Sequence, residues 1–129
     1  MERLGSPERE SINPVPWLLN AFSVNMIAEF PAQVGFNEVS IEKARGMLDA
    51  GFNSAVGHPA TAEVLTSRLG LHVEANRVNV TLKPGNVALV AQVNLPRLAE
   101  GQVLTADEMA ATPVRFFRVE VIDPGDIAF

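Results

Sequence analysis

The sequence predicts a single α/β domain in which a mixed β-sheet is flanked by helices. Apolar stretches of strand length alternate along the chain with segments of helical period, which is the pattern of such domains. The length of 129 residues fits one domain, and 47% hydrophobic residues are ample for a core. The sequence contains no internal repeats or low-complexity tracts, so nothing indicates a second unit.

The expected elements follow one another through a domain over residues 15–122. In order they are a strand over 16–20, a short helix from 23 to 28 or 29, a strand over 33–39, a helix over 41–50, a strand over 52–56, a helix from 59 to 70, strands over 78–83 and 87–93, a short helix between 105 and 113, and a strand over 114–122. Residues 1–14 are polar and aperiodic, which predicts a flexible tail, and 123–129 are expected to form a loose one.

Caps and breakers set the boundaries of the helices. Ser23 and Ser40 stand where a hydroxyl can accept from the N–H groups of a first turn. Residues 105–108 have the form of a capping box. Gly51 and Gly70 end two helices, since glycine readily takes the left-handed conformation beyond a last turn.

Apolar patterns identify the strands of the second half. The segment 78–83 alternates between apolar and polar residues, and 87–93 is nearly all apolar, as in a central strand covered on both faces. Pro84-Gly85-Asn86 between them is turn-like and short, so we expect the two to form a hairpin. The final strand over 114–122 also alternates.

Composition excludes several kinds of site and partner. Ten Lys and Arg against 15 Asp and Glu give a net charge of −5, so stable binding of duplex nucleic acid is not expected. Without cysteine there can be no disulfide or thiolate site, which favours a reducing, cytoplasmic location. No apolar run approaches the roughly 18–20 residues of a membrane span. With only His58 and His72 and no carboxylate cluster beside them, we expect neither metal nor cofactor.

The stretch 53–61 is the strongest candidate for a functional site. An apolar strand there ends in Gly57, followed by His58 and by Pro59, which suits the first turn of a helix. His58 is therefore expected beside free backbone N–H groups and the positive end of a helix dipole, where phosphate is favoured. The alternative is that His58 only caps the helix and fills the junction. His72 has no partner nearby in sequence and is expected to be an ordinary surface residue.

Polar residues follow three strands at their carboxyl ends, where ligands bind in α/β sheets. These groups are Asn20 to Ser23, His58, and Arg97 with Glu100, and we expect one site built from all three. The alternatives are capping and turn chemistry for the first group and a solvated ion pair for the last.

This set of side chains suits cleavage of a phosphodiester by its own ribose 2′-hydroxyl. Histidine, whose unperturbed pKa lies near about 6.5, can protonate the leaving oxygen. Arginine stabilises the charged transition state, and Glu100 can orient Arg97 or a hydroxyl. No nucleophile elbow, Walker loop or dinucleotide fingerprint is present.

Four motifs carry a family resemblance. They are Leu-Leu-Asn-Ala-Phe-Ser-Val-Asn-Met at 18–26, Ala-Val-Gly-His at 55–58, Asn-Arg-Val at 76–78 and Arg-Leu-Ala-Glu-Gly at 97–101. In order and spacing the region from Trp17 to Ile122 resembles a viral and prokaryotic family, long a domain of unknown function, whose members are ring nucleases. These degrade cyclic tetra-adenylate, the second messenger of type III CRISPR defence, and the viral ones act as anti-CRISPR proteins.

The resemblance implies a homodimer whose two-fold axis matches the symmetry of the cyclic ligand. It implies His58 as the general acid, Arg97 as the arginine on the scissile phosphate and Glu100 as a glutamate needed for activity. The expected ligand contacts are Asn20, Ala21, Phe22, Ser23, Asn25, Gly57, Thr61 and Arg77. The product is expected to be linear di-adenylate with a 2′,3′-cyclic phosphate, formed without metal in the cytoplasm, or the host cytoplasm for a viral protein.

One departure from the family pattern follows the histidine. Many relatives have an acidic residue and a serine there, whereas this chain has Pro59-Ala60-Thr61, in which Thr61 can supply a hydroxyl. Two rival functions stay open: a dimer that binds DNA or RNA without cleaving it, and a protein that only sequesters the cyclic nucleotide.

Overall fold

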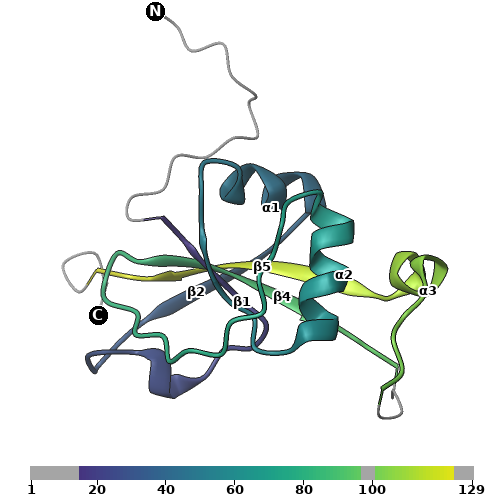
Figure 1. Cartoon of the computed structure of the whole chain (residues 1–129). Coiled ribbons are helices and arrows are strands. Elements are labelled where there is room, and N and C mark those ends of the chain that lie inside the picture. The colour runs from purple at the N-terminus through teal and green to yellow at the C-terminus, as the bar shows by residue number, and fades with distance from the viewer. Residues whose placement is uncertain (1–14, 97–100, 124–129) are drawn as a thin grey trace, which may run out of the picture.

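Five strands form one mixed sheet of order β2-β5-β4-β1-β3 in the computed structural model, which describes residues 15–96 and 101–123 (Figure 1). The elements are β1 (Trp17–Leu19), the 3-10 helix η1 (Val24–Met26), β2 (Val34–Val39), α1 (Ile41–Leu48), β3 (Asn53–Ala55), α2 (Pro59–Leu69), β4 (Val87–Val93), α3 (Ala106–Ala111) and β5 (Val114–Val121). The predicted fold class, a single domain with a mixed sheet and flanking helices, is confirmed, and β4 is the central strand as expected.

The sheet consists of two halves that share β4. In the parallel half, β1 lies between β3 and β4 and runs parallel to both, with Leu19 in register with Ala55 and Val90. In the antiparallel half, β5 lies between β4 and β2 and runs antiparallel to both. Because β3, β1 and β4 run in one direction, their carboxyl ends meet at the same edge of the sheet.

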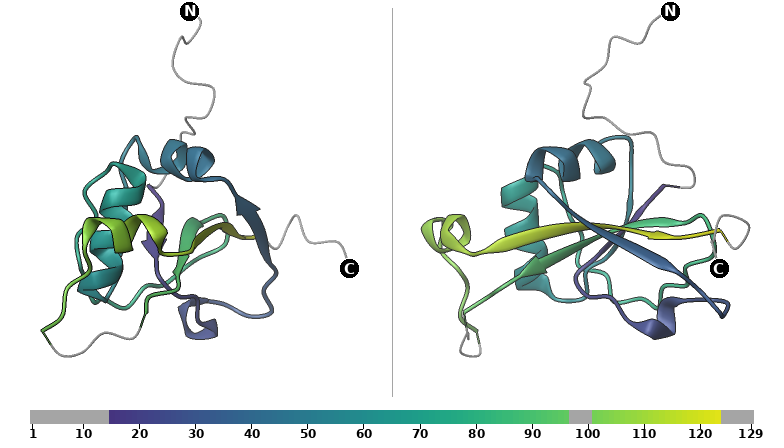
Figure 2. Two further views of the ribbon diagram at one scale, coloured as in Figure 1. Left: turned by 90° about the vertical axis from the view of Figure 1, so that its right-hand side faces the viewer. Right: turned by 180° about the vertical axis from the view of Figure 1, so that it is seen from behind.

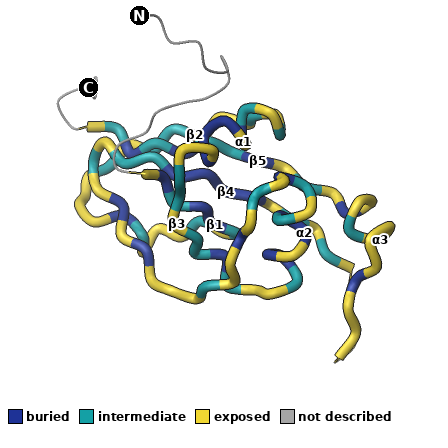
Figure 3. Tube along the Cα trace, turned by 45° about the horizontal axis from the view of Figure 1, so that its top comes forward, coloured by how far each residue is buried: buried dark blue, intermediate teal, exposed yellow. Residues whose placement is uncertain are grey.

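Each face of the sheet has its own covering layer. Helices α1 and α2 lie on one face, and the irregular segments 20–33 and 78–86 lie on the other (Figure 2). Buried residues are concentrated in the central strands β1 and β4, whereas the outlying segments are mostly exposed (Figure 3). The core under the helices includes Leu18, Ala44, Met47, Leu65, Leu89 and Phe116, and the core under the irregular segments includes Leu19, Ile27, Leu82, Val90 and Val119. Alternate residues of each strand therefore serve alternate cores, as a pleated strand requires.

Most predicted helix ends are confirmed. The Ser40 hydroxyl accepts from the Lys43 N–H at 3.1 Å, and Thr105 and Glu108 form both bonds of the capping box. Gly70 ends α2 with φ of 71°, in the left-handed region. The first helix is a single 3-10 turn that ends at Met26, short of residues 28 and 29, and the helix expected over 41–50 ends at Leu48.

The predicted hairpin of 78–83 with 87–93 is wrong. Leu82 makes a single bridge to Ile27, and no ladder strand forms over 78–83. Val80 and Leu82 are buried against the sheet while Asn79 and Thr81 are exposed, so burial of one side produces a period of two without strand pairing. The antiparallel partner of β4 is instead β5, which the chain reaches after α3.

Candidate functional site

A pocket of about 380 Å³ lies where β1 and β3 end, and we call it the junction pocket. It is lined by Asn20, Ala21, Met26, Ala55, Gly57, His58, Arg77, Val78 and Val80. The carboxyl ends of two parallel strands and the returning segment 77–80 thus meet here. Five of the predicted site residues come together in this pocket: Asn20, Ala21, Gly57, His58 and Arg77.

His58 occupies the N-cap position of α2, with φ of −118° and ψ of 120°. Its carbonyl accepts from the Ala62 N–H at 3.0 Å, and Pro59 follows in the first turn, where no N–H is needed. The backbone therefore starts the helix, whereas the exposed side chain makes no capping hydrogen bond. The interpretation of His58 as a helix cap therefore accounts for its backbone only. Its imidazole takes no part in the cap and is available to a ligand.

Both backbone polar groups of Gly57 contact a pocket side chain. Its N–H donates to the Asn20 Oδ1 at 3.4 Å, and its carbonyl accepts from the Arg77 Nη2 at 3.4 Å. A Cβ placed on Gly57 would lie 3.5 Å from the Arg77 Nε, so the arginine side chain lies directly against the glycine. Asn20, directly after β1, and Arg77, beyond α2, thereby converge on the residue before His58.

The pocket favours an anion. Within the described residues, the Arg77 guanidinium forms no ion pair with a carboxylate; its hydrogen-bond partner is the Gly57 carbonyl. The N-terminus of α2 adds the partial positive charge of a helix dipole beside it. A cation next to a helix N-terminus suits a phosphate group.

One wall of the pocket is apolar and was not predicted from the sequence. Met26, Ala55, Val78 and Val80 form this wall. The alternation of apolar and polar residues over 78–83 could have indicated this wall, but the same alternation also predicts a strand. Apolar side chains beside a few polar groups are typical of pockets for small organic ligands.

Four of the expected ligand contacts do not line the junction pocket. The Phe22 ring packs edge-on against Phe36 with 5.2 Å between ring centroids. The Ser23 hydroxyl accepts from the Asn25 N–H at 3.2 Å and caps η1. This is the capping role that the alternative interpretation gives to Ser23. Asn25 is exposed. Thr61 is only 6% exposed on the inner side of α2.

The third strand end continues from the same edge of the sheet. β4 extends past β1 to Val93, and Asn94 to Pro96 line a different pocket together with residues at the end of α3. Arg97 and Glu100 lie outside the described residues, and so do the predicted tail over 1–14 and, except for Asp123, the one over 123–129. The contribution of Arg97 and Glu100 to the site stays a prediction.

The described residues contain neither a metal-binding cluster nor a helix able to span a membrane. Over 15–96 and 101–123, no group of three His, Cys, Asp or Glu side chains is placed to hold a metal ion. Within the same ranges no helix has the length and apolar character needed to cross a membrane.

Comparison with known proteins identifies relatives among archaeal viruses. The chain is 39% identical over 101 residues to ORF117 of Acidianus two-tailed virus, an alignment that covers 75% of this chain and 85% of the relative. It is 34% identical over 87 residues to protein 26 of Sulfolobus islandicus filamentous virus, covering 66% and 73%.

The fold has a solved counterpart as well. The structure of B116 of Sulfolobus turreted icosahedral virus superposes with a TM-score of 0.66 at 30% identity, covering 81% of this chain and 97% of that one. The sequence model of the STIV B116-like family matches residues 16–116, a region that includes every described residue of the junction pocket. The chain therefore belongs to the STIV B116-like family.

Proposed function

We propose that this protein is a metal-independent ring nuclease that cleaves cyclic tetra-adenylate and so switches off type III CRISPR signalling in the host cytoplasm. The observation that carries the proposal is the junction pocket at a helix N-terminus. Among the described residues, its imidazole has no hydrogen-bond partner and its guanidinium has no carboxylate partner, only the Gly57 carbonyl. The motif resemblance at residues 18–26, 55–58, 76–78 and 97–101 supplies the substrate.

The chemistry follows from these groups. A ribose 2′-oxygen of the substrate attacks the adjacent phosphorus and loses its proton to solvent water, while the bond from phosphorus to the 5′-oxygen breaks. The His58 imidazolium donates its proton to that leaving 5′-oxygen, and the products are a 2′,3′-cyclic phosphate and a 5′-hydroxyl. The cation of Arg77 and the N-terminus of α2 stabilise the charge that develops on the phosphoryl oxygens.

The size of the pocket supports action as a homodimer. About 380 Å³ is near the lower end of the roughly 300–1,000 Å³ typical of ligand pockets, which suits one nucleotide better than a ring of four. Two copies related by a two-fold axis bring two such pockets to one symmetric ring. Cleavage at both His58 residues would convert the ring into two molecules of linear di-adenylate.

The test is incubation of the purified protein with cyclic tetra-adenylate in EDTA, with products separated by chromatography. We expect the wild type to produce di-adenylate, and His58→Ala to be slower by about 100- to 10,000-fold, the usual contribution of a general acid. His72→Ala is the matched control, because this second histidine is exposed and lies outside the junction pocket, and it should keep wild-type activity.

Three other outcomes would redirect the proposal. An intact ring bound tightly by the wild type and by His58→Ala would make the protein a sponge for the nucleotide. Binding of DNA or RNA without any binding of the ring would return it to the nucleic-acid-binding class, which the net charge of −5 disfavours. Activity that disappears in EDTA would contradict metal independence.

A further inference from the structure

The segment that follows α2 is fastened to the structure at successive residues. Thr66 of α2 holds its start, since the hydroxyl accepts from the Val73 N–H at 2.9 Å, while its own proton is donated within α2 to the Ala62 carbonyl at 2.9 Å. The Ser54 hydroxyl of β3 donates to the Glu74 carbonyl at 2.6 Å. We call residues 73–77 the strap, because they run along the outer edge of β3 and return the chain to Gly57 and His58.

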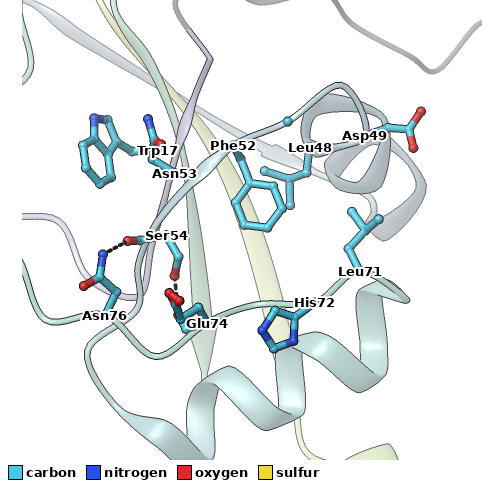
Figure 4. A pocket seen from close by; sticks show the side chains of 11 residues that line it. Trp17, Leu48, Asp49, Phe52, Asn53, Ser54, Leu71, His72, Glu74 and Asn76 are labelled. Carbon is cyan, nitrogen blue, oxygen red and sulfur yellow. Dashed lines mark hydrogen bonds between the residues drawn. The ribbon is translucent and has the colours of Figure 1, made fainter.

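Asn76 makes the last two bonds of the strap before Arg77. Its backbone N–H donates to the Val56 carbonyl at 2.7 Å, and its side-chain Nδ2 donates to the Ser54 carbonyl at 2.8 Å. Figure 4 shows the Asn76 amide joined to Ser54, beside the bond from Ser54 to Glu74. Since β3 is the last strand of the sheet, these carbonyls belong to an edge that would otherwise lack partners.

The position of Arg77 depends on this attachment. The arginine follows Asn76 directly, is exposed, and contacts Gly57 through one long hydrogen bond of 3.4 Å. Such a bond is too weak by itself to hold a side chain with many rotamers. The strong bonds lie one residue earlier, at Asn76, so they determine where the Arg77 backbone begins.

We propose that Asn76 is a positioning residue for Arg77: by clamping the strap to the Ser54 and Val56 carbonyls, it holds the Arg77 backbone where the guanidinium can lie against Gly57 at the junction pocket. This inference rests on the proposed function, because Arg77 acts there on the phosphate of the ring. Asn76 itself does not line the junction pocket; it faces the outer edge of β3, and its effect on the ligand passes through Arg77.

The experiment is a double-mutant cycle on cleavage of cyclic tetra-adenylate, using Asn76→Ala, Arg77→Ala and the double variant. We expect Asn76→Ala to lower kcat/KM about ten-fold, in keeping with the cost of a slightly misplaced group. In the Arg77→Ala background the same change should lower it less than about two-fold, because the group that Asn76 positions is gone. Thr66→Val is the matched control: it loosens the start of the strap at Val73, and it should lower the melting temperature without a ten-fold loss of kcat/KM.

Two outcomes would overturn the positioning role of Asn76, and a third would refute the proposed function. A ten-fold loss from Asn76→Ala in both backgrounds would show that the asparagine supports the fold in general, and would overturn the positioning role. No loss in the wild-type background would overturn it as well. A wild-type protein that leaves the ring intact would refute the proposed function itself, an outcome that the Asn76 variants do not influence.

Discussion

The two halves of the sheet treat their charged side chains differently. In the antiparallel half, charges pair within the sheet: the Arg115 guanidinium donates to both Glu38 carboxylate oxygens at 3.0 and 2.8 Å, and Arg118 lies 2.9 Å from Glu120. At the carboxyl edge of the parallel half, within the described residues, the Arg77 guanidinium meets only a backbone carbonyl, and the His58 imidazole makes no hydrogen bond. Charges that neutralise one another support the sheet, whereas charges left without a counterion can serve a ligand.

Strand direction explains why the two halves differ. In the antiparallel half, Glu38 of β2 and Arg115 of β5 lie on neighbouring strands, where opposite charges can pair across the ladder, and Arg118 and Glu120 lie two residues apart on β5. Parallel strands end together, and the chain must leave each end through a loop or helix N-terminus, which gathers free N–H groups at one edge. The following predictions test this division, beginning with the strand that both halves share.

The largest effect on stability is expected from Leu89→Ala in β4. Leu89 is fully buried and lies in register with Leu18 of β1 and Arg118 of β5. Truncation of such a leucine costs about 2–5 kcal/mol of the free energy of unfolding. The measurement is urea unfolding followed by far-UV circular dichroism and by fluorescence of Trp17, the sole tryptophan, which lies in the parallel half.

The two signals should move together if β4 joins the halves into one cooperative unit. Val103→Ala is the control, because Val103 is 72% exposed and its truncation should change the free energy of unfolding by less than about 0.5 kcal/mol. Two separate transitions would mean that the halves unfold independently, which would contradict their union through β4 in one cooperative unit.

A smaller effect, on activity alone, is expected from Gly57→Ala in the parallel half. Its new Cβ would meet the Arg77 Nε at 3.5 Å, an ordinary van der Waals contact, so the fold should tolerate it. A phosphate drawn to the helix N-terminus passes close to this backbone, so the methyl group should lower kcat/KM at least about ten-fold, or 1.4 kcal/mol.

Gly35→Ala in β2 is the matched control in the antiparallel half. There the added Cβ would meet the Ile122 Cδ1 at 3.9 Å, and we expect neither activity nor the melting temperature to change appreciably. Equal losses of activity from the two glycine variants would contradict the assignment of ligand binding to the parallel half.

The same division explains what could be predicted from the sequence. Helices with clear caps at Ser40, Thr105 and Gly70, and the apolar run of β4, were predicted because local chemistry determines them. The Gly57-His58 junction was also predicted, since a strand, a glycine and a proline in succession leave few arrangements of the backbone.

The strap and the segment after it could not be predicted from local patterns. The alternation of 78–83 has the same period in a strand and in a coil that lies flat on a sheet, and only the tertiary partner distinguishes them. The clamp at Asn76 joins residues 22 positions apart, a separation that no local motif encodes. The apolar wall of the junction pocket takes Met26, Ala55 and Val80 from three separate segments of the chain, which only the fold brings together.

The smallest effect is expected from Glu38→Gln in the antiparallel half. The hydrogen bonds from Arg115 lower the pKa of the Glu38 carboxyl below its ordinary value, so the charged form is favoured in the folded state. A lowered folded-state pKa gives a stabilisation that is present at neutral pH and is lost as the pH falls through that pKa. Wild type should thus unfold at slightly higher urea than Glu38→Gln at pH 7, and the difference should vanish in acid below the lowered pKa. High salt at pH 7 should also reduce the difference, because both side chains are exposed and their attraction is screened.

A difference that stays constant from neutral to acid pH would mean that packing, including the Arg115 guanidinium 5.0 Å from the Phe117 ring, stabilises this edge in place of the charge pair. The antiparallel half would then resemble the parallel half in leaving its charges energetically unpaired, and the contrast between them would no longer locate the site.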